Sequence, residues 1–96
     1  MNLNEYSKVC HQIAVEKGFW DVNQSIPTKL MLIVTEVSEA CEADRKGDLE
    51  NFKEELADTF IRLLDLCGYF KIDIEKEING KMIINKGRPK LHGKKY

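Results

Sequence analysis

The chain has 96 residues, the length of one small domain, and 43% of them are hydrophobic, enough for a modest core. Its 15 Lys and Arg residues nearly balance 16 Asp and Glu residues. This balance argues against a nucleic-acid-binding or membrane-surface protein, because those classes carry a clear excess of one charge. A chain this short buries little of its surface alone, so we expect it to self-associate.

The three cysteines, Cys10, Cys41 and Cys67, lie among apolar neighbours, and none belongs to a CxxC motif. An odd number without a pairing framework predicts reduced, buried thiols in a cytoplasmic protein. The first eight residues, MNLNEYSK, lack the basic start and the apolar run of a signal peptide. The longest apolar run, residues 30–34, is too short to cross a bilayer.

The first half of the chain predicts two helices from apolar residues at helical spacing. The first covers about residues 2–17 and is ended by Gly18. After a loop, the second covers about residues 28–45, with Pro27 in its first turn. Apolar side chains surround most of its first half, which predicts burial on more than one face, as inside a bundle. One stripe of this helix consists of Leu30, Val34, Val37 and Cys41.

The second half predicts two more helices, capped at their starts by Asp48 and Asp73. The fourth helix ends within residues 85–89, and a basic tail of about residues 88–96 follows. Only a few residues connect the second and third helices, so we expect them to form an antiparallel pair. No strand pattern competes with these helices, and the predicted fold is a single all-α domain of residues 1–96.

Two pairs of acids stand out on the second and third helices. Glu36 and Glu39 are three residues apart, as are Glu55 and Asp58, so each pair shares a helix face. Either pair alone would be an ordinary solvated face, but both border apolar stripes, and the hairpin turns them toward each other. Four close carboxylates cannot all stay ionised without a cation. Oxygen ligands select Mg²⁺, Mn²⁺ or Ca²⁺ over zinc, so the sequence predicts a divalent-metal site.

Arg62 and Asp65 continue the acidic stripe of the third helix. They form either a ladder of intrahelical ion pairs or a group that orients a neighbouring ligand or cation.

Lys81, Asn85 and Arg88 recur at helical spacing near the end of the fourth helix. They form either a phosphate-binding stripe or a solvated basic helix end. Trp20, the only tryptophan, is either a core or interface anchor or a platform for a base.

The segments LMLIVTEVSEACEADRKG, EELADTFIRLLDL and KMIINKGRPKLHGKKY, in this order, resemble the all-α nucleotide pyrophosphohydrolases of the MazG-like superfamily. The shared motif is ExxE, a variable spacer and ExxD, which here is Glu36 to Glu39 and Glu55 to Asp58. The resemblance extends from about Glu16 to the end of the chain. It implies a four-helix domain whose bundle is completed by homodimerisation or tetramerisation.

The resemblance also implies an enzyme, a hydrolase that splits nucleoside triphosphates into monophosphate and pyrophosphate and so cleans the nucleotide pool. It implies Mg²⁺, with Mn²⁺ as a substitute, and Glu36 or Glu39 would help to deprotonate the attacking water. The metal ligands would be Glu36, Glu39, Glu55 and Asp58. The nucleotide would contact Lys81, Asn85, Arg88 and Trp20.

The residues around the acids differ from those typical of phosphoribosyl-ATP pyrophosphohydrolases, which argues against phosphoribosyl-ATP as the substrate. Some dCTP-type relatives carry an aromatic residue just after ExxE, and this chain has none there. The sequence therefore does not identify the base or the sugar of the substrate. The alternative function is a non-catalytic interaction or nucleotide-sensing module of the same fold.

Overall fold

The computed structural model describes all of residues 1–96 and contains four α-helices, a short terminal 3-10 turn and no strand. The all-α prediction is therefore confirmed. The helices are α1 (Leu3–Glu16), α2 (Ile26–Arg45), α3 (Leu49–Phe70) and α4 (Ile74–Lys86), and the turn is η1 (Lys90–Gly93). None of these helices combines the length and the hydrophobicity that crossing a bilayer requires.

Side-chain caps fix where the helices begin, because the first backbone N–H groups of a helix have no partner within it. Asp48 accepts a hydrogen bond from the Asn51 N–H at 3.1 Å, and Asp73 accepts one from the Lys76 N–H at 3.1 Å. Both predicted caps are thus present. Ser25 caps α2, which therefore begins two residues before the predicted start.

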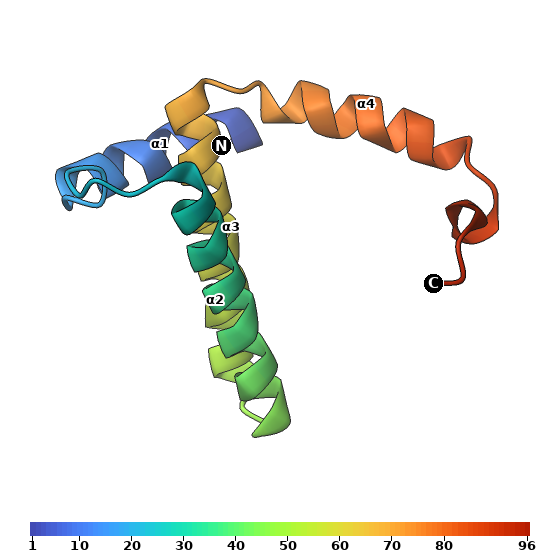
Figure 1. The fold of residues 1–96 in the computed structure, drawn as a ribbon, viewed down its shortest axis with the longest axis horizontal. Helices are drawn as coiled ribbons and strands as arrows, with labels where there is room; N and C mark the ends of the chain where they lie inside the picture. The colour runs from blue at the N-terminus through green and yellow to red at the C-terminus, as the bar shows by residue number, and fades with distance from the viewer.

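The core lies where α2 and α1 pack against α3. Figure 1 shows α2 and α3 as an antiparallel hairpin, with α1 crossing the C-terminal half of α3. At this crossing the Ser7 hydroxyl donates to the Leu64 carbonyl at 2.7 Å. A Cβ on Gly68 would lie 2.6 Å from the Ser7 carbonyl oxygen, so only glycine permits this approach. Gly68 therefore serves helix packing, and α3 continues for two residues beyond it.

Residues 74–96, which we call the α4 arm, extend away from the hairpin (Figure 1). Asn4 of α1 fixes the start of the arm: its amide nitrogen donates to Asp73 at 2.9 Å, and its oxygen accepts from the Ile74 N–H at 3.0 Å. No residue of α4 is buried. The arm is thus attached at its base and uncovered along its length.

Only five residues of the chain are buried, so much apolar surface is left open. On α2, Val34 and Val37 are each 51% exposed. The prediction that α2 is buried on more than one face is therefore wrong for a single chain, because α3 is the one helix that packs along it. All three cysteines are free, but Cys41 is exposed and Cys10 only half-buried, so the prediction of buried thiols holds for Cys67 alone.

Candidate active site

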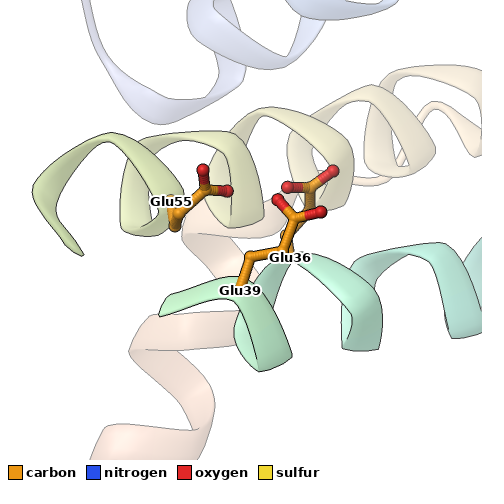
Figure 2. A group of neighbouring side chains, drawn as sticks. All are labelled: Glu36, Glu39 and Glu55. Carbon is orange, nitrogen blue, oxygen red and sulfur yellow. The ribbon is translucent and has the colours of Figure 1, made fainter. Parts of the chain in front are cut away.

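Three of the four predicted acids converge between α2 and α3. One carboxylate oxygen each from Glu36, Glu39 and Glu55 lies within 4.8 Å of the others. Figure 2 shows Glu36 and Glu39 reaching from α2 toward the face of α3 that carries Glu55. The three-residue spacing gives the two α2 acids one face, and the short turn of the hairpin brings α3 opposite. We call these three side chains the carboxylate cluster.

Asp58 lies outside this cluster, which corrects the expectation of a four-acid group. It is exposed and lines a neighbouring cavity. An aspartate is one methylene shorter than a glutamate, so Asp58, one turn along α3 from Glu55, does not reach the other three carboxylates. Its negative charge still contributes to raising the pKa of Glu55.

The cluster fits a divalent cation on the chemistry of its donors. The Glu55 Oε2 atom is buried and has no hydrogen-bond partner. The adjacent Glu39 carboxyl, then burial, then Glu36 raise the pKa of Glu55 to about 7. A cation would give the unpaired oxygen a partner and would favour the ionised form of all three acids. Carboxylate oxygens are the donors that Mg²⁺ and Mn²⁺ prefer.

Arg62 joins α3 to α2 at the edge of the cluster. Its Nε donates to Glu36 Oε1 at 2.8 Å, and this hydrogen bond holds the pKa of Glu36 below its usual range. Arg62 makes no ion pair with Asp58 or Asp65 along its own helix. Of the two sequence interpretations, the structure therefore favours a group that orients a neighbouring ligand.

A cavity of about 420 Å³ opens beside the cluster and shares Glu36 with it. Ligand pockets in proteins span roughly 300–1,000 Å³ and combine apolar walls with a few polar groups. This cavity follows that pattern, with Gln24 and Lys29 as polar side chains and Asp58 and Arg62 near the cluster. Its apolar lining includes Ile13, Phe19, Leu32 and Ile61.

Trp20 also lines the cavity, and its indole ring is held in place by α3. The ring stacks on Tyr69 with centroids 4.2 Å apart, and its N–H donates to Asp65 at 2.9 Å. Asp65 also lies 2.8 Å from the His11 Nδ1, and the Lys29 Nζ sits 3.9 Å from the Trp20 ring centroid. Trp20 is thus an anchor of the loop before α2, and its role as a base platform stays a prediction.

The sequence interpretation did not find Tyr69 or Lys29. Tyr69 follows Asp65 by four residues on α3, a spacing that places both side chains on one helix face. This spacing could have indicated that both contact the same residue. Lys29 carried no such signal, because its contact with Trp20 depends on the path of the intervening loop.

The α4 arm places Lys81, Asn85 and Arg88 away from the cluster. All three are exposed, and none lines the cavity. A single chain therefore does not bring the basic stripe to the carboxylates, and its contact with nucleotide stays a prediction.

A family model described as phosphoribosyl-ATP pyrophosphohydrolase matches residues 20–79, more than half of the chain. No curated protein and no solved structure matches. The matched segment contains Trp20, both acid pairs and Arg62, and it ends before Lys81. This match contradicts the expectation that the residues around the acids set the chain apart from that group. The chain belongs to the phosphoribosyl-ATP pyrophosphohydrolase family, all-α MazG-like hydrolases that cleave phosphoanhydride bonds of nucleotides.

Proposed function

We propose that the chain is a Mg²⁺-dependent enzyme that hydrolyses a ribo- or deoxyribonucleoside triphosphate to the monophosphate and pyrophosphate. Mn²⁺ would serve as a substitute. One observation carries this proposal: the carboxylate cluster, with its buried unpaired oxygen, lies directly beside a cavity of nucleoside size. The phosphates would then meet the cluster while the nucleoside occupies the cavity.

Glu36, Glu39 and Glu55 would hold the cation, and Asp58, which lies outside this cluster one turn along α3 from Glu55, would have to change its side-chain rotamer to join them. The bound Mg²⁺ would neutralise phosphate charge and polarise the phosphoanhydride bond. Mg²⁺ sites in proteins commonly combine a few carboxylates with substrate phosphates, which suits a cluster that is open on one side.

Glu39 is the best candidate for the general base. Of the three clustered acids it is the exposed one, and it has no cationic partner. Glu36, by contrast, has one oxygen engaged by Arg62. Glu39 would accept a proton from the water that attacks phosphorus, and the P–O bond to the pyrophosphate leaving group would break.

The cavity would select the nucleoside. Its apolar walls suit the faces of a base, and Gln24 and Lys29 supply a carbonyl, an amide and an ammonium group for base or sugar edges. Trp20 would support the cavity wall from a fixed position, because Tyr69 stacks on its ring and the Lys29 ammonium group lies close to the ring centroid.

A second copy of the chain would complete the site. Residues 81–96 contain six Lys or Arg and no Asp or Glu, whereas the whole chain has a net charge of −1, so the remainder is acidic. The α4 arm also exposes Met82 (62%) and Ile83 (76%). A basic, apolar arm matches the acidic, apolar hairpin of another copy. In a homodimer or homotetramer this contact would bring Lys81, Asn85 and Arg88 to the phosphates.

A screen for pyrophosphate release with Mg²⁺ tests the proposal on canonical and modified nucleoside triphosphates, with phosphoribosyl-ATP included. We expect release that needs the cation, and a loss of about 100-fold or more in Glu39→Gln, the range for removal of a general base. Glu42→Gln, an exposed change one turn along α2, is the matched control and should keep full activity.

Turnover of phosphoribosyl-ATP alone would replace the proposed substrate with the one in the family description. Nucleotide binding without any release would favour the sensing module. A folded Glu39→Gln with unchanged rate would refute its role as the base.

A further inference from the structure

Arg62 touches the carboxylate cluster at a single point. Its Nε donates to one oxygen of Glu36 at 2.8 Å, and its side chain makes no other hydrogen bond. The second oxygen of Glu36 is left for another interaction. The Glu36 side chain is 12% exposed and that of Arg62 34%. A charged hydrogen bond that is partly shielded from water is strong and directional, so it can fix a rotamer.

The position of this contact matters as much as its strength. Glu36 is the one member of the cluster that also lines the cavity, so its orientation decides how the two parts of the site meet. Glu39 lies on the same helix and has no such restraint, and Glu55 has an unpaired oxygen.

We propose that Arg62 is a positioning residue: it holds Glu36 so that the free carboxylate oxygen faces the point shared with Glu39 and Glu55, where a divalent cation binds. The inference rests on the proposed function, because it assumes that the cluster holds such a cation. Groups that orient metal ligands typically change metal affinity by about 10- to 100-fold when removed.

Two roles for an arginine at this place predict effects of opposite sign. If Arg62 only neutralised the acids, it would repel an incoming cation, and removing its charge would tighten cation binding. If Arg62 positions Glu36, removing it weakens cation binding even though the repulsion is gone, because Glu36 must then be ordered by the cation itself. The sign of the change therefore separates the two roles.

The experiment is a titration of the full chain with Mn²⁺ in the absence of nucleotide, followed by the electron paramagnetic resonance signal of the free ion. We expect Arg62→Met to weaken Mn²⁺ binding by about tenfold or more. Arg62→Lys keeps the charge and a donor, so it should recover part of that loss and still bind more weakly than the wild type.

Arg45→Met is the matched control. Arg45 is exposed at the end of α2, where it pairs with Glu42, and it lies outside the cluster. Its removal changes the net charge by the same amount. Because solvent and salt screen exposed charges, Mn²⁺ affinity should stay within about twofold.

A double-mutant cycle with Glu36→Gln tests whether Arg62 acts through Glu36. If it does, adding Arg62→Met to Glu36→Gln causes no further loss of Mn²⁺ affinity. A general structural role for Arg62 would instead give additive losses, together with a lower melting temperature by circular dichroism.

Mn²⁺ binding by Arg62→Met that equals or exceeds that of the wild type overturns the inference, as do additive losses in the cycle. Should Arg62→Met not fold, wild-type affinity in Arg62→Lys overturns it instead. A wild-type chain that binds no Mn²⁺ and releases no pyrophosphate overturns the proposed function and this inference together. If the wild type binds Mn²⁺ and releases pyrophosphate, but the Arg62 variants bind Mn²⁺ as tightly as the wild type, only the inference about Arg62 is overturned.

Discussion

The α2–α3 hairpin and the α4 arm contain similar helices, but they differ in what the single chain gives them as partners. The hairpin has caps, a packed neighbour and an interhelical ion pair between Arg62 and Glu36. The arm has caps and is fixed only at its base. Caps and local sequence define where each helix begins, whereas tertiary contacts supply most of its stability and decide where it lies.

The same difference separates the two halves of the candidate site. The carboxylate cluster is assembled within one chain, because its residues come from two helices that pack on each other. The basic residues of the arm have no acidic partner in that chain. Three predictions test this contrast, and the first of them tests whether the site is shared between two copies.

The largest expected effect is the return of activity when two inactive variants are mixed. Glu39→Gln would disable the carboxylate cluster and leave the arm intact. Arg88→Ala would disable the arm and leave the carboxylate cluster intact. If the arm serves a partner copy, a mixed dimer contains one site in which both parts are intact. After the two chains are unfolded and refolded together, pyrophosphate release should rise well above that of either variant alone.

Two controls complete this test. Each variant refolded by itself must stay inactive, and a double variant carrying both changes must not rescue either one. If mixing restores nothing although native mass spectrometry shows mixed assemblies, the arm does not complete the cluster of another copy.

A glycine-to-alanine substitution should have opposite effects in the two regions. Gly68→Ala places a methyl group 2.6 Å from the Ser7 carbonyl oxygen and 2.7 Å from the His11 Cβ. We expect a loss of about 1–3 kcal/mol in the free energy of unfolding, as for other overpacked interiors. Gly80→Ala meets no atom within 4 Å, so it should stabilise α4 by about 1 kcal/mol through helix propensity.

Chemical denaturation of both variants, followed by circular dichroism, checks this pair. If Gly80→Ala destabilises the protein, the arm packs closely against other residues. The arm would then not differ from the hairpin in its packing. A neutral Gly68→Ala would contradict the close crossing of α1 and α3.

The smallest expected effect is a pH dependence of stability in the metal-free protein. The pKa of Glu55 is raised from 4.5 to about 7 in the fold. Between these values the folded chain binds more protons than the unfolded chain, so the free energy of unfolding falls as pH rises. This contribution is complete below about pH 4.5 and is lost as pH rises through about 7.

Melting temperatures measured from pH 5 to 8 with a chelator present check the prediction. Glu55→Gln should flatten the slope, whereas Glu77→Gln, on the arm, should leave it unchanged. If the melting temperature of Glu55→Gln depends on pH as steeply as that of the wild type, Glu55 does not bind the additional proton in the folded chain.

Much of the fold and part of the site could be predicted from the sequence, because the signals were local. Asp48 and Asp73 predicted helix starts, and the spacing of Glu36 and Glu39 placed both acids on one face. Asp58 was predicted as a fourth member, but side-chain reach across a hairpin depends on the helix separation, which spacing does not give.

The contacts that sequence reasoning missed join distant segments. Arg62 has acids three and four residues away on its own helix, yet it pairs with Glu36, twenty-six positions earlier. Trp20 likewise contacts residues far away in the sequence, Asp65 and Tyr69. The position of Lys81 could not be predicted either, because no residue of α4 is buried against the rest of the chain and local signals do not fix where the helix lies.

The direction of the α4 arm is set at its base, far from the carboxylate cluster, where Asn4 of α1 forms hydrogen bonds with Asp73, Ile74 and Glu75. Asn4 bonds to both Asp73 and Ile74, next to Lys71, whose φ of 56° turns the chain out of α3. A substitution at Asn4 would therefore redirect the arm while leaving the carboxylate cluster in place. The direction of the arm and the chemistry of the carboxylate cluster therefore depend on different residues, and a substitution can change one without the other.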